Sequence, residues 1–278
     1  ACLDALVASA KQAEVDLEAI VVDDASPDGT AAAVRERFPW VVVVPGSGSL
    51  FWNRGMHKGF ALALQRPADH YLWLNDDTHL VPGALTQLLA QSASLQRSTG
   101  VPVIVVGATA ERDSGRISYG VRIAKSRLRP FNYHLVFSDD EPVPCEAIEG
   151  NCVLIPRAVA QRVGNLDPAF EHAMGDTDYG LRARRLGFRS YVASGVIGHC
   201  SPNPLGGTYF DTSLPLARRW QLIKGRKGLP VSSWRLFCRR HGGALWPLHF
   251  AWPYAKVVLT GMRAGLRRRE APAAAKAT

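Results

Sequence analysis

Two adjacent carboxylates, Asp76 and Asp77, directly follow the buried-strand pattern of residues 71–74. Side chains just past a strand end face the crevice in which open α/β sheets bind ligands. Neighbouring carboxylates repel each other unless a cation or strong hydrogen bonds compensate for their charge. Their oxygen atoms suit Mg²⁺ or Mn²⁺, which are usually shared with substrate phosphates. The pair therefore indicates a metal and phosphate site, and the alternative from the residues alone is a solvated Asn-Asp-Asp turn.

A second carboxylate pair, Asp23 and Asp24, follows the apolar run of residues 17–22. A carboxylate at such a strand end can accept hydrogen bonds from a base or from ribose hydroxyls, as acidic residues do in dinucleotide folds. Neither a G-x-G-x-x-G fingerprint nor a Walker A motif is present. Ser26 or Asp28 would cap the helix that follows. We expect Asp24 to contact a nucleotide.

Asp176 and His199 are single candidates at the start of a predicted helix and at the end of a predicted strand. Asp176 could act as a general base toward a hydroxyl nucleophile. Asp176 or Asp178 could equally be only a helix N-cap, which is the preferred interpretation for Asp178. A lone His is usually a hydrogen-bonded structural residue. Combined with Asp77, however, His199 would give a nitrogen and oxygen site that favours Mn²⁺ over Mg²⁺.

Strands and helices that alternate along the chain must position these residues. The apolar patterns predict strands at residues 17–22, 40–44, 71–74, 103–106, 152–155 and 191–197. They predict helices at residues 2–10, 30–37, 55–65, 83–95, 156–163 and 179–186. Such alternation is typical of an α/β fold with a mostly parallel sheet flanked by helices. Residues 110–145 are polar and irregular, so we expect an irregular or antiparallel excursion near the sheet edge.

Charge divides the chain into two parts. Its 278 residues are 47% hydrophobic, enough for one full core and an appendage. Of the net charge of +9, residues 212–278 carry +13, with 14 Lys and Arg against one acidic residue, and residues 1–211 carry −4. We expect a domain at residues 1–211 and a basic helical region at residues 212–278. The basic region favours an anionic partner, either a membrane surface or nucleic acid.

Cysteine usage and hydropathy predict a cytoplasmic protein. The five cysteines are odd in number and form no C-x-x-C pair, which fits a reducing compartment rather than a disulfide framework or a zinc site. The first residues lack a basic start and an apolar core, so no signal peptide is expected. No run of about 18 apolar residues predicts a transmembrane helix.

Six stretches in order make the chain resemble the inverting family-2 nucleotide-sugar glycosyltransferases of the GT-A fold, and rhamnosyltransferase-like members in particular. They are VVDDASPDGT, GSGSLFWNRGMHKG, YLWLNDD, EGNCVLIPR, GDTDYGLRARRLGF and SGVIGHCS. The resemblance implies a hexosyltransferase-type enzyme (EC 2.4) in cell-surface polysaccharide synthesis. Its donor would be a nucleotide-diphosphate sugar, with dTDP-rhamnose as first candidate, and its acceptor a saccharide or lipid-linked saccharide. It also implies that the family's first strand is missing from residue 1 onward.

The resemblance assigns donor roles to four residues. Asp24 matches the carboxylate that contacts the donor base, and Asp23 lies beside it. Asp76 touches the donor ribose or sugar, or supports its neighbour. Trp52 forms an apolar wall of the donor site. His57 stands where the family usually has Asn, which is a departure from the pattern.

The resemblance also assigns the metal ligands and the base. Asp77 matches the last residue of the D-x-D motif, which binds the divalent metal at the donor diphosphate, and His199 matches a metal or diphosphate ligand. Asp176 matches the catalytic base of a single displacement. Two departures are Asn75 in place of the first Asp of D-x-D, and Gly175 in place of the usual Glu before the base.

Cations alternate with Trp and Tyr in residues 212–278, which favours contact with an anionic membrane surface. Because Pro247 and Pro253 interrupt any long helix, we expect short interfacial helices there. The enzyme would then be peripheral on the inner face of the cell membrane. The alternatives are a solvated basic subdomain and a nucleic-acid-binding protein, although no nucleic-acid-binding motif is visible, so no nucleic-acid partner is expected. A sugar nucleotidyltransferase is a third alternative, but it would show a Gly-rich, basic N-terminal loop.

Overall fold

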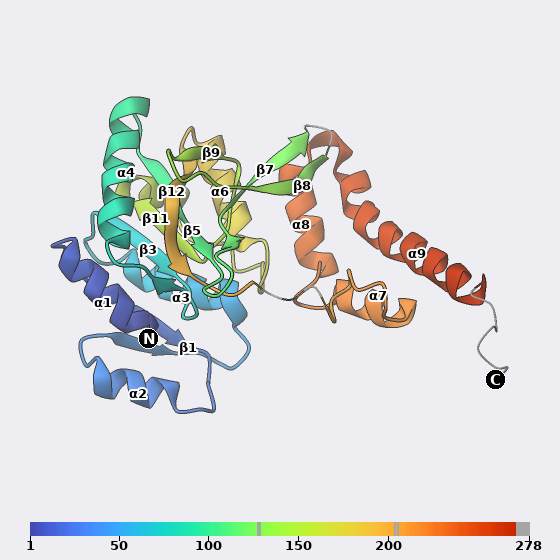
Figure 1. Ribbon diagram of the computed structural model, residues 1–278, viewed down its shortest axis with the longest axis horizontal. Helices are drawn as coiled ribbons and strands as arrows, with labels where there is room; N and C mark the ends of the chain where they lie inside the picture. The colour runs from blue at the N-terminus through green and yellow to red at the C-terminus, as the bar shows by residue number, and fades with distance from the viewer. Residues whose placement is uncertain (127–128, 203, 205, 271–278) are drawn as a thin grey trace. The chain divides into compact units, whose positions relative to one another are not determined.

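The protein is described by a computed structural model that covers residues 1–126, 129–202, 204 and 206–270 (Figure 1). The chain divides into two compact units, Ala1–Pro202 and Asn203–Thr278. Part of the predicted basic region, residues 271–278, lies outside the described residues.

A seven-stranded sheet forms the centre of the first unit, with the order β3-β11-β5-β12-β4 and with β6 and β9 paired to β5 and β12. Its strands are β3 (His70–Leu74), β4 (His79–Leu80), β5 (Val103–Ala110), β6 (Ile117–Tyr119), β9 (Val143–Cys145), β11 (Cys152–Pro156) and β12 (Arg189–His199). β12 runs parallel to β5, whereas β11 lies antiparallel between β3 and β5. The sheet is therefore more mixed than the expected mostly parallel arrangement. β11 is reached through short antiparallel strands rather than through a crossover helix, and this connection reverses its direction.

Two small sheets accompany the central one. β1 (Ile20–Asp23) and β2 (Val42–Pro45) pair in parallel, joined by α2 (Thr30–Arg37). β7 (Val121–Ser126), β8 (Arg129–Val136) and β10 (Ala147–Ile148) form an antiparallel sheet. β6, β7, β8 and β9 together form the antiparallel excursion expected at residues 110–145.

Helices pack on both faces of the central sheet, as predicted. They are α1 (Cys2–Gln12), α3 (Phe51–Ala63), α4 (Ala84–Thr99), α5 (Arg157–Val163) and α6 (Gly175–Arg185). Alternate residues of β5 point to opposite faces. Ile104 packs in one cluster with Phe60 of α3 and Tyr179 of α6. Val103 packs in a second cluster with Leu88 of α4 and residues of α1.

Two helices begin earlier than the apolar pattern predicted. α3 begins at Phe51 and not at residue 55, and α6 begins at Gly175 and not at residue 179. The early turn of α6 is polar, so its hydrophobic periodicity is weak, whereas the early turn of α3 contains Phe51 and Trp52. Contacts from other elements hold both turns. Asp176 and Asp178 consequently lie in the first turn of α6 rather than in the loop before it.

The second unit is helical, with α7 (Leu216–Lys224), α8 (Val231–His241), a 3₁₀ turn (Gly243–Leu245) and α9 (Trp246–Glu270). Trp234 of α8 donates its indole N–H to the carbonyl oxygen of Phe250 at 3.1 Å, and Tyr254 donates its hydroxyl to the carbonyl oxygen of Leu229 at 2.7 Å. These bonds and the buried Tyr254 and Val257 attach α9 to its neighbours.

The expected interruption of this region by two prolines is wrong, because α9 is continuous over 25 residues. Pro247 lies in the first turn, where the backbone N–H has no helical partner in any case. Pro253 lies inside the helix and removes one hydrogen bond, a cost that the packing of the adjacent Tyr254 offsets. Among the described residues, no helix combines the length and apolar character needed to cross a bilayer.

Candidate active site

Asp24 lies just past β1 and binds the loop that leads into α3. Its Oδ1 accepts the N–H of Gly48 at 2.7 Å, and its Oδ2 accepts the N–H groups of Leu50 at 2.8 Å and Phe51 at 3.0 Å. Desolvation acts to raise the pKa of Asp24, but these backbone hydrogen bonds outweigh it and lower that pKa. A Cβ at Gly46 would lie 2.5 Å from Asp24 Oδ1. Asp24 therefore organises the Gly-Ser-Gly-Ser loop and the start of α3.

Asp23, the other member of this pair, stabilises the turn that follows β1. Its Oδ1 accepts the N–H of Ser26 at 3.3 Å. Asp28 accepts both the N–H of Thr30 at 3.0 Å and its hydroxyl at 2.6 Å, which forms an Asx turn before α2. The expectation that Ser26 or Asp28 caps α2 is wrong, because Gly29 is the N-cap residue and no side chain in the described part of the chain caps the helix.

Asp76 and Asp77 lie at the centre of the turn between β3 and β4. The N–H of Thr78 donates to the carbonyl oxygen of Asn75 at 3.1 Å, which closes the turn. Both Asp side chains are exposed. The solvated turn expected as the alternative is thus present, and it leaves two carboxylates accessible to a ligand.

The end of β12 lies beside this turn. β4 pairs antiparallel with β12 so that His79 is opposite His199. Burial, and then the negative charge of Asp77, raises the pKa of the Cys200 thiol, so Asp77 lies near the residue that follows His199. Within the described part of the chain, the buried Nδ1 of His199 has no hydrogen-bond partner. The fold therefore places Asp77 near Cys200, which directly follows His199, and burial keeps Cys200 a neutral thiol.

These residues fit a cation that is shared with a substrate. Over the residues that the structure describes, no group of three or more His, Cys, Asp or Glu side chains could hold a metal. Asp77 and His199 would supply one oxygen and one nitrogen ligand. Mg²⁺ and similar cations often take one or two protein ligands and fill their other positions with water and substrate phosphates. The site suits such a cation and does not form a closed protein cage.

Trp52 connects the Asp76-Asp77 turn with the turn between β10 and β11. Its indole N–H donates to Asn75 Oδ1 at 2.6 Å, and the N–H of Asn75 donates to the carbonyl oxygen of Asn151 at 2.9 Å. A Cβ at Gly150 would lie 2.2 Å from the indole ring, so only glycine fits against it. Asn75, a departure from the expected D-x-D pattern, is therefore a structural partner of Trp52.

Asp176 lies on the other side of the β10–β11 turn, in the first turn of α6. Its Oδ2 accepts the N–H of Gly150 at 3.0 Å, and its Oδ1 accepts the N–H of Thr177 at 2.7 Å. Burial raises the pKa of Asp176 to about 6, against the lowering effect of these hydrogen bonds. A carboxylate with that pKa is mostly ionised at pH 7 and is a stronger base than an exposed Asp.

The glycine before Asp176 is required by packing. A Cβ at Gly175 would lie 1.6 Å from Oδ1 of Asn53, a fully buried residue of α3. Asn53 is fixed in turn, because its Nδ2 donates to the carbonyl oxygens of Asp167 at 2.8 Å and Phe170 at 2.6 Å. The departure at Gly175 therefore has a steric cause: no acidic side chain fits at that position.

Two further expectations concern residues near Asp176. The interpretation of Asp178 as an N-cap is wrong, because its buried carboxylate forms an ion pair with Arg182 at 2.8 Å, one turn further along α6. Arg182 also donates to the carbonyl oxygens of Val163, the last residue of α5, and of Asn165, which follows that helix. His57, the third departure, lies within 2.7 Å of the carbonyl oxygen of Leu166 through its Nδ1 and so has a structural contact.

The sequence reasoning missed Glu149, which directly precedes Gly150. Its carboxylate accepts the N–H of Gly120 at 3.1 Å, and its negative charge adds to the effect of burial on the pKa of Asp176. The signal was present in the stretch EGNCVLIPR, where an acidic residue adjoins a glycine at the start of a buried strand.

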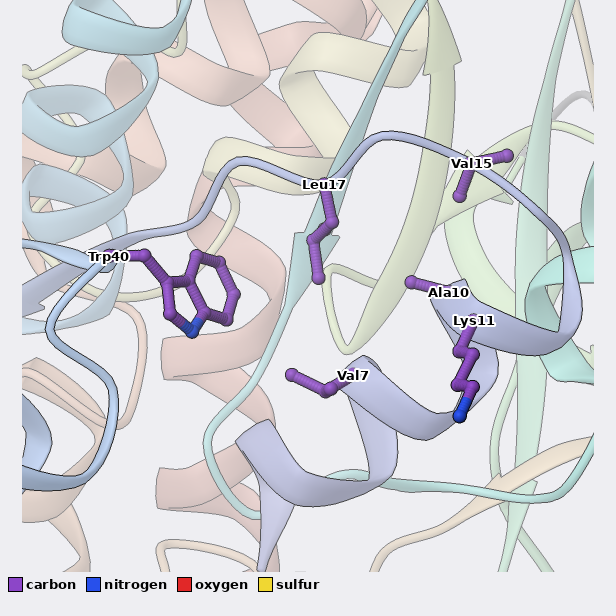
Figure 2. Close-up of a pocket in the computed structure, with 6 residues that line it drawn as sticks. All are labelled: Val7, Ala10, Lys11, Val15, Leu17 and Trp40. Atoms are coloured by element: carbon purple, nitrogen blue, oxygen red, sulfur yellow. The ribbon is translucent and has the colours of Figure 1, made fainter.

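A separate hollow of about 250 Å³ lies between α1, the segment that follows it and the loop before β2 (Figure 2). Its lining consists of Val7, Ala10, Lys11, Val15, Leu17 and Trp40. The lining is apolar apart from Lys11 and includes none of the predicted site residues. The hollow is therefore distinct from the region around Asp76, Asp77, Asp176 and His199, which is called the acidic site below.

Comparison with known proteins gives one family. Residues 1–222 match the family described as "Glycosyltransferase like family 2". An N-acetylglucosaminyl-diphospho-decaprenol L-rhamnosyltransferase of Mycobacterium tuberculosis is 24% identical over 213 residues, which is 69% of each chain.

Two solved structures are similar in fold. A mannosyltransferase from Pyrobaculum calidifontis, in complex with GDP-Man and Mn²⁺, has a TM-score of 0.52 at 18% identity and covers 98% of this chain and 72% of its own. GalNAc-T7 with UDP, GalNAc and Mn²⁺ has a TM-score of 0.50 at 13% identity. The match covers 74% of this chain and 41% of GalNAc-T7. At these identities the likeness shows the fold alone, and it confirms the expected GT-A class.

Proposed function

Because this chain belongs to the glycosyltransferase-like family 2, we propose that it transfers a sugar from a nucleotide-diphosphate donor to a saccharide or lipid-linked saccharide acceptor, with inversion. Rhamnose is the first candidate, since the curated relative at 24% identity is an L-rhamnosyltransferase acting on a lipid diphosphate-linked sugar. The observation that carries the proposal is the single network linking the Asp76-Asp77 turn, through Trp52 and Gly150, to Asp176.

The donor would lie between the Asp24 loop and the Asp76-Asp77 turn. The loop held by Asp24 shapes one side, and Asp23 fixes the turn beside it. Trp52 offers an apolar ring next to Asn75, and the exposed Asp76 is placed to accept hydrogen bonds from ribose or sugar hydroxyls. This arrangement supports recognition of a nucleotide sugar without a Gly-rich phosphate loop.

Asp77 and His199 would hold Mn²⁺ or Mg²⁺ together with the donor diphosphate. The titles of both similar structures include Mn²⁺ and a nucleotide or nucleotide sugar. When bound, the cation neutralises negative charge that develops on the leaving diphosphate.

Asp176 would take the proton from the attacking hydroxyl of the acceptor. The hydroxyl oxygen forms a new bond to the anomeric carbon while the bond from that carbon to the diphosphate oxygen breaks. The proton passes to the Asp176 carboxylate and the diphosphate leaves with the bonding electron pair. One carboxylate is sufficient, because a single displacement forms no covalent enzyme intermediate and inverts the anomeric centre.

Binding of a panel of nucleotide sugars, including dTDP-rhamnose, with Mn²⁺ or with a chelator tests this proposal. We expect one donor to bind at least tenfold more tightly with Mn²⁺. Asp77→Asn should abolish this metal dependence, because it removes the anionic ligand. Asp76→Asn, the matched change at the adjacent exposed residue, should weaken donor binding but keep the metal dependence. Equal donor binding in chelator and in Mn²⁺ would contradict the role of the metal.

We propose further that the second unit binds an anionic membrane surface, which places the enzyme at the inner face of the membrane with a lipid-linked acceptor. Five side chains spaced three, four or seven residues apart form an outward apolar stripe on α9 and the turn before it. They are Leu245, Leu248, Trp252, Leu259 and Met262, each between 48% and 66% exposed. Exposed cations such as Lys256 and Arg263 lie on the same helix. An amphipathic helix with these features is typical of interfacial binding.

A further inference from the structure

The catalytic base proposed above lies beside a second carboxylate that belongs to another element. Asp176 is on α6, whereas Glu149 is on the turn between β10 and β11. The residue next to Glu149 makes the direct contact, since the N–H of Gly150 donates to Asp176 Oδ2 at 3.0 Å. Glu149 and the base are therefore one backbone residue and one hydrogen bond apart.

The turn that carries Glu149 has little freedom to move. Gly150 is packed against the Trp52 ring, where even a Cβ would lie 2.2 Å from the nearest ring atom. The Glu149 carboxylate accepts the N–H of Gly120, the residue just before β7, at 3.1 Å. Both the backbone and the side chain of Glu149 are thus anchored, and its charge has a fixed position relative to Asp176.

Two other carboxylates lie near Asp176. On the same helix, Asp178 is buried and forms an ion pair with Arg182 at 2.8 Å. On the β10–β11 turn, the carboxylate of Glu149 disfavours ionisation of Asp176, after the larger effect of burial. The neighbouring position 175 cannot supply such a charge, because Asn53 occupies the space of its side chain.

We infer that Glu149 is a positioning residue for sugar transfer: it orients Asp176 through the Gly150 turn and keeps that carboxylate basic enough to accept the hydroxyl proton. This inference rests on the proposed function of Asp176. A like charge close to a carboxylate disfavours its ionised form and strengthens it as a base.

The test is the pH profile of kcat/KM for the acceptor in the full-length chain with Mn²⁺ and donor. Glu149→Gln retains an oxygen that can accept the Gly120 N–H. For this variant we expect the acidic limb of the profile, near pH 6, to move to lower pH by roughly half a pH unit or more. The plateau value of kcat/KM should fall up to about tenfold. Glu149→Asp should restore most of both values. Glu141→Gln, the same change at an exposed loop residue, should leave the limb in place.

A lower rate with an unmoved acidic limb in Glu149→Gln would overturn the inference, because a purely structural role affects the rate at every pH. Asp176→Asn separates this failure from that of the proposed function. If Asp176→Asn keeps both the rate and the acidic limb, Asp176 is not the base and the proposed function fails. If Asp176→Asn loses activity while the Glu149→Gln limb stays at the wild-type pH, only the inference about Glu149 fails.

Discussion

At the scale of single residues, the carboxylate of Asp176 is held with a raised pKa at a cost in stability. The carboxylate is largely enclosed and receives two backbone hydrogen bonds, yet burial raises its pKa to about 6. A folded-state pKa above the unfolded value means that the fold prefers the protonated acid. The stability that protonation contributes is complete below the usual pKa of about 4 and is lost as the pH rises through about 6.

Asp176→Asn should therefore separate activity from stability. We expect turnover to fall roughly 100-fold or more, the usual scale for loss of a general base. At pH 8 the variant should unfold at a higher urea concentration than the wild type. Its free energy of unfolding should be larger by up to about 3 kcal/mol, because the unfavourable ionisation of Asp176, about two pKa units, disappears. Near pH 4 the two proteins should be equally stable. Urea unfolding at both pH values measures the difference.

Asp178→Asn is the matched control for this prediction. It removes the charge that pairs with Arg182, so it should destabilise the protein at both pH values. A loss of stability at pH 8 in Asp176→Asn, like that of the control, would contradict the unfavourable ionisation of Asp176.

Residue type and position in the sequence supplied three candidates for the site. Asp77 and His199 could be singled out because each follows an apolar run that must be a buried strand, and Asp176 because it precedes a predicted helix. Packing partners distant in sequence could not be predicted. Glu149 was missed because Asp176, whose pKa it affects, is on another element. Asp178 was predicted to cap the helix, but its buried carboxylate pairs with Arg182 instead.

At the scale of elements, the start of α6 is set by its contact with α3. Asn53 reaches from α3 to two carbonyls of the segment before α6 and fills the space beside Gly175. The Asn53 side chain of α3 therefore fills the space that a side chain at Gly175 of α6 would need. Asp176 directly follows this contact between the two helices.

Gly175→Ala and Asn53→Ala should consequently be coupled. Each single variant should lose about 2 kcal/mol or more, the first by overpacking and the second by a cavity and unpaired carbonyls. In the double variant the alanine at 175 enters the space that Asn53 leaves, so the loss should fall short of the sum by at least about 1 kcal/mol. Urea unfolding of the four proteins gives the coupling energy. Additive losses would contradict the steric account of Gly175.

Element positions were largely predictable, and strand directions were not. The apolar runs near Tyr71, Val103 and Cys152 mark strands whatever their neighbours are. The antiparallel direction of β11 depends on the connection through β6 to β10, and no pattern within residues 152–155 encodes it. The early start of α3 has a similar cause, because the Asp24 carboxylate that receives its first N–H groups lies 27 residues before Phe51.

At the scale of the whole molecule, charge and exposed apolar surface are concentrated in the second unit. From residue 212 onward the chain has 14 Lys and Arg against one acidic residue. The stripe on α9 adds apolar side chains that the unit itself does not cover. In the proposed membrane binding, the basic charge would supply attraction to anionic lipids, and the apolar residues would supply insertion into the interface.

Leu248→Ser combined with Trp252→Ser should reduce co-sedimentation with vesicles containing anionic phosphatidylglycerol at least tenfold, because both anchors leave the stripe. Leu186→Ser, at an exposed leucine of the first unit, should bind as the wild type does. Vesicles of neutral lipid should bind all variants weakly, and salt should weaken the binding of the wild type.

Unchanged vesicle binding in the double serine variant would contradict insertion through the stripe. Loss of a wild-type dimer in that variant, measured by analytical ultracentrifugation without lipid, would instead assign the stripe to contact with a second copy of the chain. Donor binding with Mn²⁺ should be the same in all these variants, since none of the altered residues belongs to the acidic site.

The position of Trp52 has a practical consequence. Its indole touches Gly150, which donates its N–H to Asp176, and bonds to Asn75, which begins the Asp76-Asp77 turn. Indole emission is sensitive to local polarity and hydrogen bonding, so Trp52 is a built-in optical sensor for events on either turn. A Trp52→Phe variant would isolate its signal from those of the other six tryptophans, and ligand occupancy of the acidic site could then be followed without a label.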